Sequence, residues 1–294
     1  MDGLLAINKP SGLTSFDVVA RIRQLTGEKH VGHGGTLDPL ATGVLLIAMG
    51  KMTRILEYFL FHDKHYTVTM ELGKTSSTFD AEGVIQEQHV QHIPEKTAIE
   101  QMTQEFTGET EQTPPAFSAV HVQGKRAYDL ARKNVQFTLQ PKTILIHAIE
   151  IQSYQYPFLS LSVHCSAGTY IRSLVHDFGQ RLSTGAMVTI LQRTALGDLL
   201  LSDCVDLSVL TPEIIPLTLL STEKCIAMLH MPPYVIPDQE LHNFLSGKLI
   251  PGEDLPPASH MVCIEQNRII GIGKVDATGT YLHPEKVFNT REEI

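Results

Sequence analysis

Several features that mark particular protein classes are missing from this 294-residue sequence. It has no tryptophan, and its four cysteines, Cys165, Cys204, Cys225 and Cys263, lie far apart without a CxxC pair. We therefore expect neither a disulfide framework nor a cysteine-based zinc site, and we infer reduced thiols. No apolar run reaches the roughly 18 residues that a membrane helix needs, and no signal-peptide pattern follows Met1. These absences predict a cytoplasmic protein that does not cross a membrane.

Charged residues are also few, at 19% of the chain, whereas apolar residues make up 43%. That balance predicts buried cores rather than disorder, and the length suggests about two domains. Much of the net charge of −9 lies in residues 197–294, which hold 6 Lys and Arg against 14 Asp and Glu. Residues 121–143, in contrast, hold five basic side chains and one Asp. Such a basic face can bind phosphates on an acidic protein, because salt screens more distant charges, but it is equally compatible with an ordinary solvated helix surface.

The hydrophobic pattern predicts strands and helices without a regular βαβ alternation. Strands are expected at residues 3–8, 44–49, 65–72, 143–153 and 159–165. Helices are expected at residues 53–60, 94–106 and 170–182, and between Ser15, as the N-cap, and Gly27. This mixture favours an α+β fold with a mixed, mostly antiparallel sheet and flanking helices.

The composition changes near residue 197, and the Met-Pro-Pro-Tyr sequence at 231–234 is typical of a linker. Beyond it, strand patterns at 261–265, 269–275 and 281–282 are separated by glycines. We therefore predict a main domain of residues 1–232 and a small, β-rich accessory domain of residues 233–294.

The most informative stretch, residues 31–45, reads VGHGGTLDPLATGVL. It places one carboxylate, Asp38, in a glycine-rich loop directly before Pro39. Glycine permits close backbone approach, and proline favours an extended backbone at the residue before it, so the loop would fix where the Asp38 carboxylate points. A single Asp-Pro pair more often opens a turn or caps a helix, so the pair alone leaves a structural role open.

Other segments offer partners for that carboxylate. In CSAGTYIRSL, residues 165–174, Tyr170 and Arg172 stand at a predicted helix start, a position that favours an anion such as a phosphate or the Asp38 carboxylate. The alternative is a core tyrosine and a surface arginine. Tyr66 begins a predicted strand, where its ring can stack on a base or pack in a core. Arg193 is expected as an exposed residue on a core strand.

Metal and cofactor motifs are not found. Gly50-Lys51 lacks the Ser or Thr and the earlier glycine of a phosphate-binding loop. The pairs His62/His65 and His89/His92 have a spacing seen in metal sites. With no carboxylate–histidine network expected around them, we interpret them as exposed side chains and predict no metal site.

Together these segments resemble the TruB family of pseudouridine synthases, in the same order along nearly the whole chain. The resemblance lies in INKPSG at 7–12 followed by Thr14-Ser15, GHGGTLDPLATG at 32–43 and GTYIR at 168–172. Tyr66 matches the family's active-site tyrosine, and Leu191 matches the leucine that lines its uridine pocket. The chain departs from the family at Ser77, where an acidic residue is common.

The resemblance implies a pseudouridine-synthase sheet followed by a PUA-like RNA-binding domain. It also implies isomerisation of uridine 55 in the T-loop of tRNA, with the target base flipped out of the loop. Asp38 would be the nucleophile or base, and Tyr66 would stack on the base and move a proton. Arg172 would pair with Asp38 and lower its pKa, since a nearby positive charge favours the ionised form.

The same resemblance implies that Tyr170 and Leu191 wall the pocket and that His33 fills the gap left by the flipped base. The reaction involves no redox step, so no cofactor and no metal are expected. The expected partner is the T-arm of tRNA, with no membrane and no protein partner, and the chain is expected to act as a monomer.

Three other readings stay open at this point. A non-catalytic RNA-binding protein or tRNA chaperone could share the fold. A glycosidase acting on a small nucleoside or sugar could use the same carboxylate. A related synthase could modify another RNA, because loop details set the choice of site.

Overall fold

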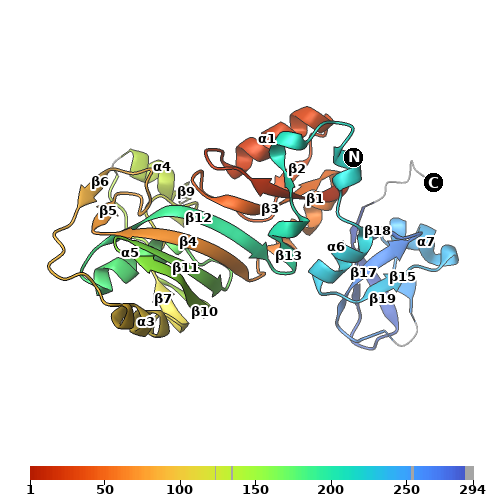
Figure 1. Cartoon of the computed structure of the whole chain (residues 1–294). Helices are drawn as coiled ribbons and strands as arrows, with labels where there is room; N and C mark the ends of the chain where they lie inside the picture. The colour runs from red at the N-terminus through yellow and green to blue at the C-terminus, as the bar shows by residue number, and fades with distance from the viewer. Residues whose placement is uncertain (123, 134, 253–254, 289–294) are drawn as a thin grey trace.

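The computed structural model describes residues 1–122, 124–133, 135–252 and 255–288. In them, a large mixed sheet with helices packed on it is followed by a smaller sheet near the C-terminus (Figure 1). None of the helices described has both the length and the apolar character that a membrane crossing requires. The α+β fold class predicted from the sequence is confirmed.

The large sheet contains ten strands within the described residues. Along its main path lie β14 (Val205–Asp206), β1 (Gly3–Lys9), β3 (Thr42–Met49), β12 (Ala186–Leu196), β4 (Lys64–Leu72), β11 (Phe158–Cys165), β10 (Lys142–Gln155) and β7 (Gly108–Gln112). Off this path, β2 (Val31–His33) pairs with β3, and β13 (Leu199–Leu200) pairs with β12. Two pairs, β1–β14 and β3–β12, are parallel, and the other pairs are antiparallel.

The parallel contact between β3 and β12 joins the two halves of this sheet. It is short, with Gln192 opposite Thr42 and Arg193 opposite Gly43. The loop that carries Asp38 leads directly into β3, and Leu191 lies in β12 next to the joint. The topology therefore brings together segments that are about 150 residues apart in the sequence.

Seven α-helices are present in the described residues: α1 (Ser15–Thr26), α2 (Leu56–Phe59), α3 (Lys96–Glu105), α4 (Ala127–Arg132), α5 (Ile171–Arg181), α6 (Thr222–Leu229) and α7 (Asp238–Leu245). Short 3-10 turns are η1 (Gly50–Ile55), η2 (Leu201–Asp203), η3 (Leu207–Val209) and η4 (Ile215–Thr218). Helix α3 packs on β10, and α5 packs on β12 and β4. Apolar side chains of α1, α3 and α5 share one buried cluster with the large sheet.

The N-cap of helix α1 lies one residue before the expected position. Thr14, not Ser15, is the N-cap, and its hydroxyl accepts a hydrogen bond from the Asp17 backbone while the Asp17 carboxylate bonds back to the Thr14 backbone N–H. Phe16, expected on the apolar face, is 63% exposed, because Val18 and the later apolar residues supply the buried face.

Residues expected to form loops or linkers also join strands. The glycine-rich segment after residue 30 starts with β2, and Tyr234 of the expected linker lies in β15 (Pro233–Val235). The two segments become strands through hydrogen bonds to β3 and β17. Neither segment alternates enough between polar and apolar residues for the sequence alone to indicate a strand.

The second sheet has the order β15, β17 (His260–Glu265), β18 (Arg268–Val275), β19 (Tyr281–Val287) and β16 (Ile250–Pro251). Its curled form, with α7 beside it, fits a PUA-like domain (Figure 1). Val262, Ile264 and Phe288 share an apolar cluster with Leu4 and Val44 of the large sheet. The two sheets thus pack together through apolar side chains.

Two small hairpins extend from this framework: β5 (Lys74–Ser76) with β6 (Ile85–Glu87), and β8 (His121–Val122) with β9 (Lys125–Arg126). The four cysteines are free, as expected.

Candidate active site

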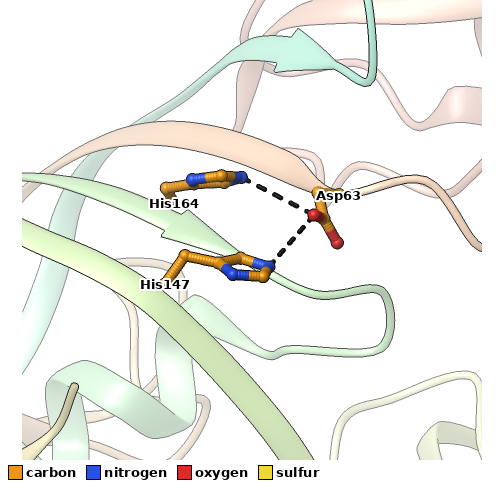
Figure 2. A group of neighbouring side chains, drawn as sticks. All are labelled: Asp63, His147 and His164. Carbon is orange, nitrogen blue, oxygen red and sulfur yellow. Dashed lines mark ion pairs between the residues drawn. The ribbon is translucent and has the colours of Figure 1, made fainter. Parts of the chain in front are cut away.

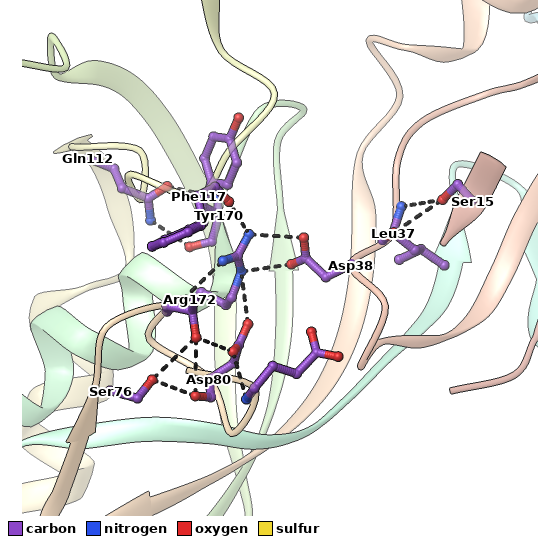
Figure 3. Close-up of polar contacts among 11 residues, drawn as sticks. Ser15, Leu37, Asp38, Ser76, Asp80, Gln112, Phe117, Tyr170 and Arg172 are labelled. Carbon is purple, nitrogen blue, oxygen red and sulfur yellow. Dashed lines mark hydrogen bonds and ion pairs between the residues drawn. The ribbon is translucent and has the colours of Figure 1, made fainter. Parts of the chain in front are cut away.

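The loop that carries Asp38 connects β2 to β3 and is held by the segment that follows β1. The backbone N–H of Gly12 donates to the carbonyl of Pro39 at 2.8 Å. The hydroxyl of Ser15 accepts from the backbone N–H of Leu37 at 2.8 Å, as Figure 3 shows. The hydroxyl of the buried Ser15 is therefore engaged in holding this loop. For that reason the neighbouring Thr14, and not Ser15, caps α1.

Lys9 also holds this loop in place, although no role for Lys9 was predicted from the sequence. Its ammonium group is buried and donates to the carbonyl oxygens of Pro10 (2.9 Å), Leu13 (2.5 Å) and Pro39 (3.3 Å). Burial lowers the pKa of Lys9 to about 8, and the Asp38 carboxylate opposes that shift. The only indication in the sequence that Lys9 has a role is its place in the INKPSG segment.

Arg172, at the start of α5, grips the Asp38 carboxylate with two hydrogen bonds, from Nε to Oδ2 at 2.8 Å and from Nη2 to Oδ1 at 2.9 Å (Figure 3). The rest of its guanidinium donates to the carbonyl oxygens of Thr78 (3.0 Å) and Phe117 (2.9 Å). The Arg172 side chain is 5% exposed, whereas that of Asp38 is 31% exposed. The predicted pairing is confirmed, and the alternative of a surface arginine is wrong.

Burial raises the pKa of the Asp38 carboxyl above its ordinary value. The positive charge and hydrogen bonds of Arg172 oppose this rise, and the nearby charge of Asp80 adds to it. Arg172 therefore lowers the pKa of Asp38, as expected, but the loss of water around the carboxyl is the larger effect and the net shift is upward.

Asp80 is a second carboxylate in this site, which the sequence reasoning did not identify. Its side chain is 3% exposed, and its Oδ2 lies 3.6 Å from Nε of Arg172. Its Oδ1 accepts from the Thr78 hydroxyl at 2.5 Å and from the backbone N–H of Glu82 at 3.1 Å. Arg172 is therefore held between two carboxylates, of which only Asp38 is open to solvent.

Tyr66 lies in β4 opposite Arg193 of β12, and both side chains are buried. Arg193 is 1% exposed and donates to the carbonyl oxygens of Val44 (2.7 Å) and Gly35 (3.3 Å), so the expectation of an exposed arginine is wrong. Those carbonyls belong to the strand and loop around Asp38, and they satisfy a charge that would otherwise be costly to bury. Burial raises the pKa of Tyr66, which the charge of Arg193 opposes.

Tyr170 and Leu191, the two residues predicted to wall the pocket, lie at the N-terminus of α5 and in β12. The backbone of Tyr170, directly before α5, exchanges two hydrogen bonds with the Gln112 side chain, at 2.8 and 3.0 Å. Burial raises the pKa of Tyr170, and the charge of Asp38 adds to the rise. Leu191 is buried in β12 within the same apolar cluster as Tyr66.

His33 is the one predicted site residue that the structure leaves outside this group. It is the last residue of β2, half-buried, and across the described residues no hydrogen bond or ion pair joins it to Asp38 or Arg172. Burial lowers the pKa of His33, because loss of water disfavours the charged ring.

The structure also shows the surroundings of Ser77 and of the two histidine pairs noted in the sequence. The Ser77 hydroxyl accepts from the backbone N–H of Val84 at 3.0 Å, so it closes the β5–β6 hairpin where the acidic residue is missing. His89 and His92 are exposed, as expected. His62 and His65 are half-buried, and His65 stacks at 3.9 Å on His164, which itself approaches Asp63. The expectation that no carboxylate–histidine network surrounds that pair is therefore wrong.

Comparison with known proteins agrees with this geometry. The model of the TruB family pseudouridylate synthase N-terminal domain matches residues 23–171. A tRNA pseudouridine synthase B of Clostridium kluyveri is 38% identical over 93% of this chain and 95% of its own length. One from a Synechococcus species is 40% identical over 98% of both chains, and one from Bacteroides fragilis is 44% identical over 69% of this chain and 90% of its own.

Among solved structures, a chain of a Cbf5–Nop10–Gar1 complex superimposes with a TM-score of 0.72. It is 27% identical, and the match covers 99% of this chain and 86% of that one. The resemblance seen in the motifs thus extends over the fold and nearly the whole length of the chain. The chain belongs to the TruB family of pseudouridylate synthases.

Proposed function

We propose that this chain converts uridine 55 in the T-loop of tRNA to pseudouridine, with Asp38 as the catalytic nucleophile or base. The observation that carries the proposal is the asymmetric pair at the site: a buried Arg172 grips a carboxylate that remains partly open to solvent. A partly exposed carboxylate can reach a substrate, while a buried guanidinium fixes its orientation and charge.

The reaction rearranges bonds within one nucleotide. The bond between C1′ and N1 of uracil breaks, the base turns, and C1′ joins C5 instead. The proton on C5 is lost and N1 gains one, so atoms balance and no electrons are exchanged with another reagent. A carboxylate suits such a step, because it can stabilise or trap an electron-poor sugar, add to the base, or remove a proton.

The surrounding residues would hold the base and move protons. We assign Tyr66 to stacking on the flipped uracil, with its hydroxyl available for proton transfer. Tyr170 and Leu191 would form the walls against which the base turns, and His33 would occupy the gap that the base leaves in the loop. Flipping the base costs a few kcal/mol, which contacts of this kind must repay.

Binding of tRNA would use surfaces beyond the pocket. Five basic side chains between β8 and β10 are exposed, and no ion pair is formed by any of them within the described ranges: Lys125, Arg126, Arg132, Lys133 and Lys142. Guanidinium and ammonium groups left unpaired at a surface suit phosphate contacts. We propose that this face and the C-terminal domain hold the T-arm.

In this proposal, residues 1–232 form the catalytic domain, and residues 233–294 form the RNA-binding accessory domain. The chain would act in the cytoplasm as a monomer on tRNA alone, without a protein partner, cofactor or catalytic metal ion. The shared apolar cluster between the two sheets supports an accessory domain that stays fixed beside the catalytic one.

Pseudouridine mapping at single-nucleotide resolution tests the proposal. The purified full chain is incubated with an unmodified tRNA transcript, with a transcript that carries cytidine at position 55, and with free uridine. The proposal predicts pseudouridine at position 55 of the first transcript alone. Modification at another position would overturn the choice of site, turnover of free uridine would favour the glycosidase-like reading, and binding without modification would favour an RNA chaperone.

A further inference from the structure

A histidine–carboxylate cluster of Asp63, His147 and His164 lies on the large sheet (Figure 2). It is separate from the proposed catalytic pocket. Nε2 of His147 is 3.0 Å from Oδ2 of Asp63, and Nε2 of His164 is 3.7 Å from the same oxygen. The three residues come from the loop before β4, from β10 and from β11, and their nearest ligand atoms all lie within 4.8 Å of one another.

The cluster occupies the opposite face of the sheet from Tyr66. Successive residues of a strand point to opposite faces, and the buried Tyr66 directly follows His65 in β4. In β11, His164 stands between Val163 and Cys165, both of which are buried in the core. The histidine rings therefore project from the outer face.

The local backbone aims the two histidines at the same point. In the pairing of β10 with β11, Ile146 lies opposite Cys165 and Ala148 lies opposite His164, so His147 is the extra residue of a β-bulge. A bulge redirects the side chain of its extra residue and is often associated with function. The ring of His164 is in turn held by stacking at 3.9 Å on His65, its cross-strand partner.

From this arrangement we propose that Asp63, His147 and His164 bind one Zn²⁺ ion. In a tetrahedral zinc site with bonds of about 2.0–2.1 Å, neighbouring ligand atoms lie roughly 3.3–3.4 Å apart. Two of the three distances between ligand atoms, 3.0 and 3.7 Å, fall on either side of that value, and the third is no more than 4.8 Å. Two imidazole nitrogens and one carboxylate oxygen form a common zinc ligand set.

The ligand chemistry selects among cations. Mg²⁺ and Ca²⁺ prefer sites made of oxygen atoms, so two imidazoles disfavour them. Three protein ligands leave one position for water. Because the Nδ1 atoms of His147 and His164 have no protein hydrogen-bond partner in the part of the chain that the structure describes, outer support for the ligands is weak, and we expect micromolar rather than nanomolar affinity.

The ion would tie the loop before β4 to the β10–β11 hairpin. Since it would lie on the face away from Tyr66, it would stabilise the sheet without entering the isomerisation. Zinc should therefore raise the midpoint of thermal unfolding while leaving the rate of pseudouridine formation unchanged. This inference concerns a separate site and stands or falls independently of the proposed tRNA substrate.

The test uses the full-length chain without a histidine tag, stripped of metal with a chelator. Zn²⁺ is titrated by calorimetry into the wild type, into His147→Ala and Asp63→Asn, and into the matched control His92→Ala, which removes an exposed histidine outside the cluster. We expect one Zn²⁺ per wild-type chain, affinity lowered at least about tenfold in the two cluster variants, and wild-type affinity in the control.

Two further readouts separate a lost site from a damaged fold. Without zinc, the thermal midpoints of His147→Ala and of the control should agree, and only the wild type and the control should gain stability when zinc is added. The result that would overturn the proposal is unchanged zinc affinity in His147→Ala, or a wild type that takes up no ion at this stoichiometry. Either result would mean that these three side chains form hydrogen bonds with one another and do not bind zinc.

Discussion

Replacing Arg172 by Gln should slow the reaction and move its pH dependence. The change removes two charge-assisted hydrogen bonds to Asp38. At roughly 1.5–3 kcal/mol each, these amount to roughly 3–6 kcal/mol of orientation and charge stabilisation. With about 1.36 kcal/mol for each tenfold change in rate, kcat/KM should fall about 10²- to 10⁴-fold.

The pH dependence adds a second, independent signature. Burial raises the pKa of Asp38 and Arg172 opposes that rise, so without Arg172 the pKa rises further. The reaction needs the ionised carboxylate and is lost as the pH falls through this pKa. The acid limb of kcat/KM should therefore move to higher pH in Arg172→Gln, and it should move less in Arg172→Lys, which keeps a positive charge but not the bidentate grip.

Release of tritium from tRNA labelled at C5 of uridine measures this, because C5 loses its hydrogen in the isomerisation. Arg181→Gln is the matched control, since Arg181 lies on the same helix with an exposed ion pair to Glu105. Binding of tRNA at fixed salt verifies that each variant is folded. Turnover equal to that of the control, with an unmoved acid limb, would refute the reasoning.

Other parts of the structure make further predictions. Gly43→Ala should destabilise the fold strongly, because the new Cβ would lie 2.2 Å from the carbonyl oxygen of Arg193 at a φ of +98°. Gly12→Ala is its control, with a φ of +85° and nothing within 4 Å, and should cost only about 1–2 kcal/mol in denaturant unfolding; equal losses in the two variants would contradict the close approach. Thr14→Ala should lower the free energy of unfolding by about 1 kcal/mol through loss of the α1 cap, and an unchanged value would mean that water replaces the cap. Asp80→Asn should slow single-turnover tritium release but keep tRNA binding. The reason is that the Arg172 guanidinium, 3.6 Å from Asp80, loses one of its two neighbouring carboxylates. An unaltered rate would show that Asp80 has no positioning role.

Elements with a strong periodic pattern could be predicted from the sequence. The alternation at 65–72 and the helical spacing at 170–182 report burial on one face directly, and β4 and α5 confirm them. The cap of α1 was misplaced by one residue because Thr14 and Ser15 both carry a hydroxyl. What distinguishes them is the bond from Ser15 to Leu37, which lies 22 positions further along the chain.

The candidate site was predicted where chemistry and motif agreed, as for Asp38 and Arg172, which lie 134 positions apart and meet in the fold. The burial of Arg193 could not be read from the sequence, because it depends on carbonyl oxygens of Val44 and Gly35 that turn towards it only after the strands pair. The Asp63 cluster was missed for a similar reason. Asp63 lies more than 80 positions before the two histidines, and a bulge redirects the side chain of His147.

The most direct test of the central claim compares the wild type with Asp38→Asn in single-turnover tritium release from tRNA. The substitution keeps the size of the side chain but removes its charge and its ability to act as nucleophile or base. The proposed role of Asp38 predicts rapid release by the wild type and none above background by the variant, with tRNA binding retained in both. Release by Asp38→Asn at the wild-type rate would contradict the assignment of Asp38 as the catalytic residue.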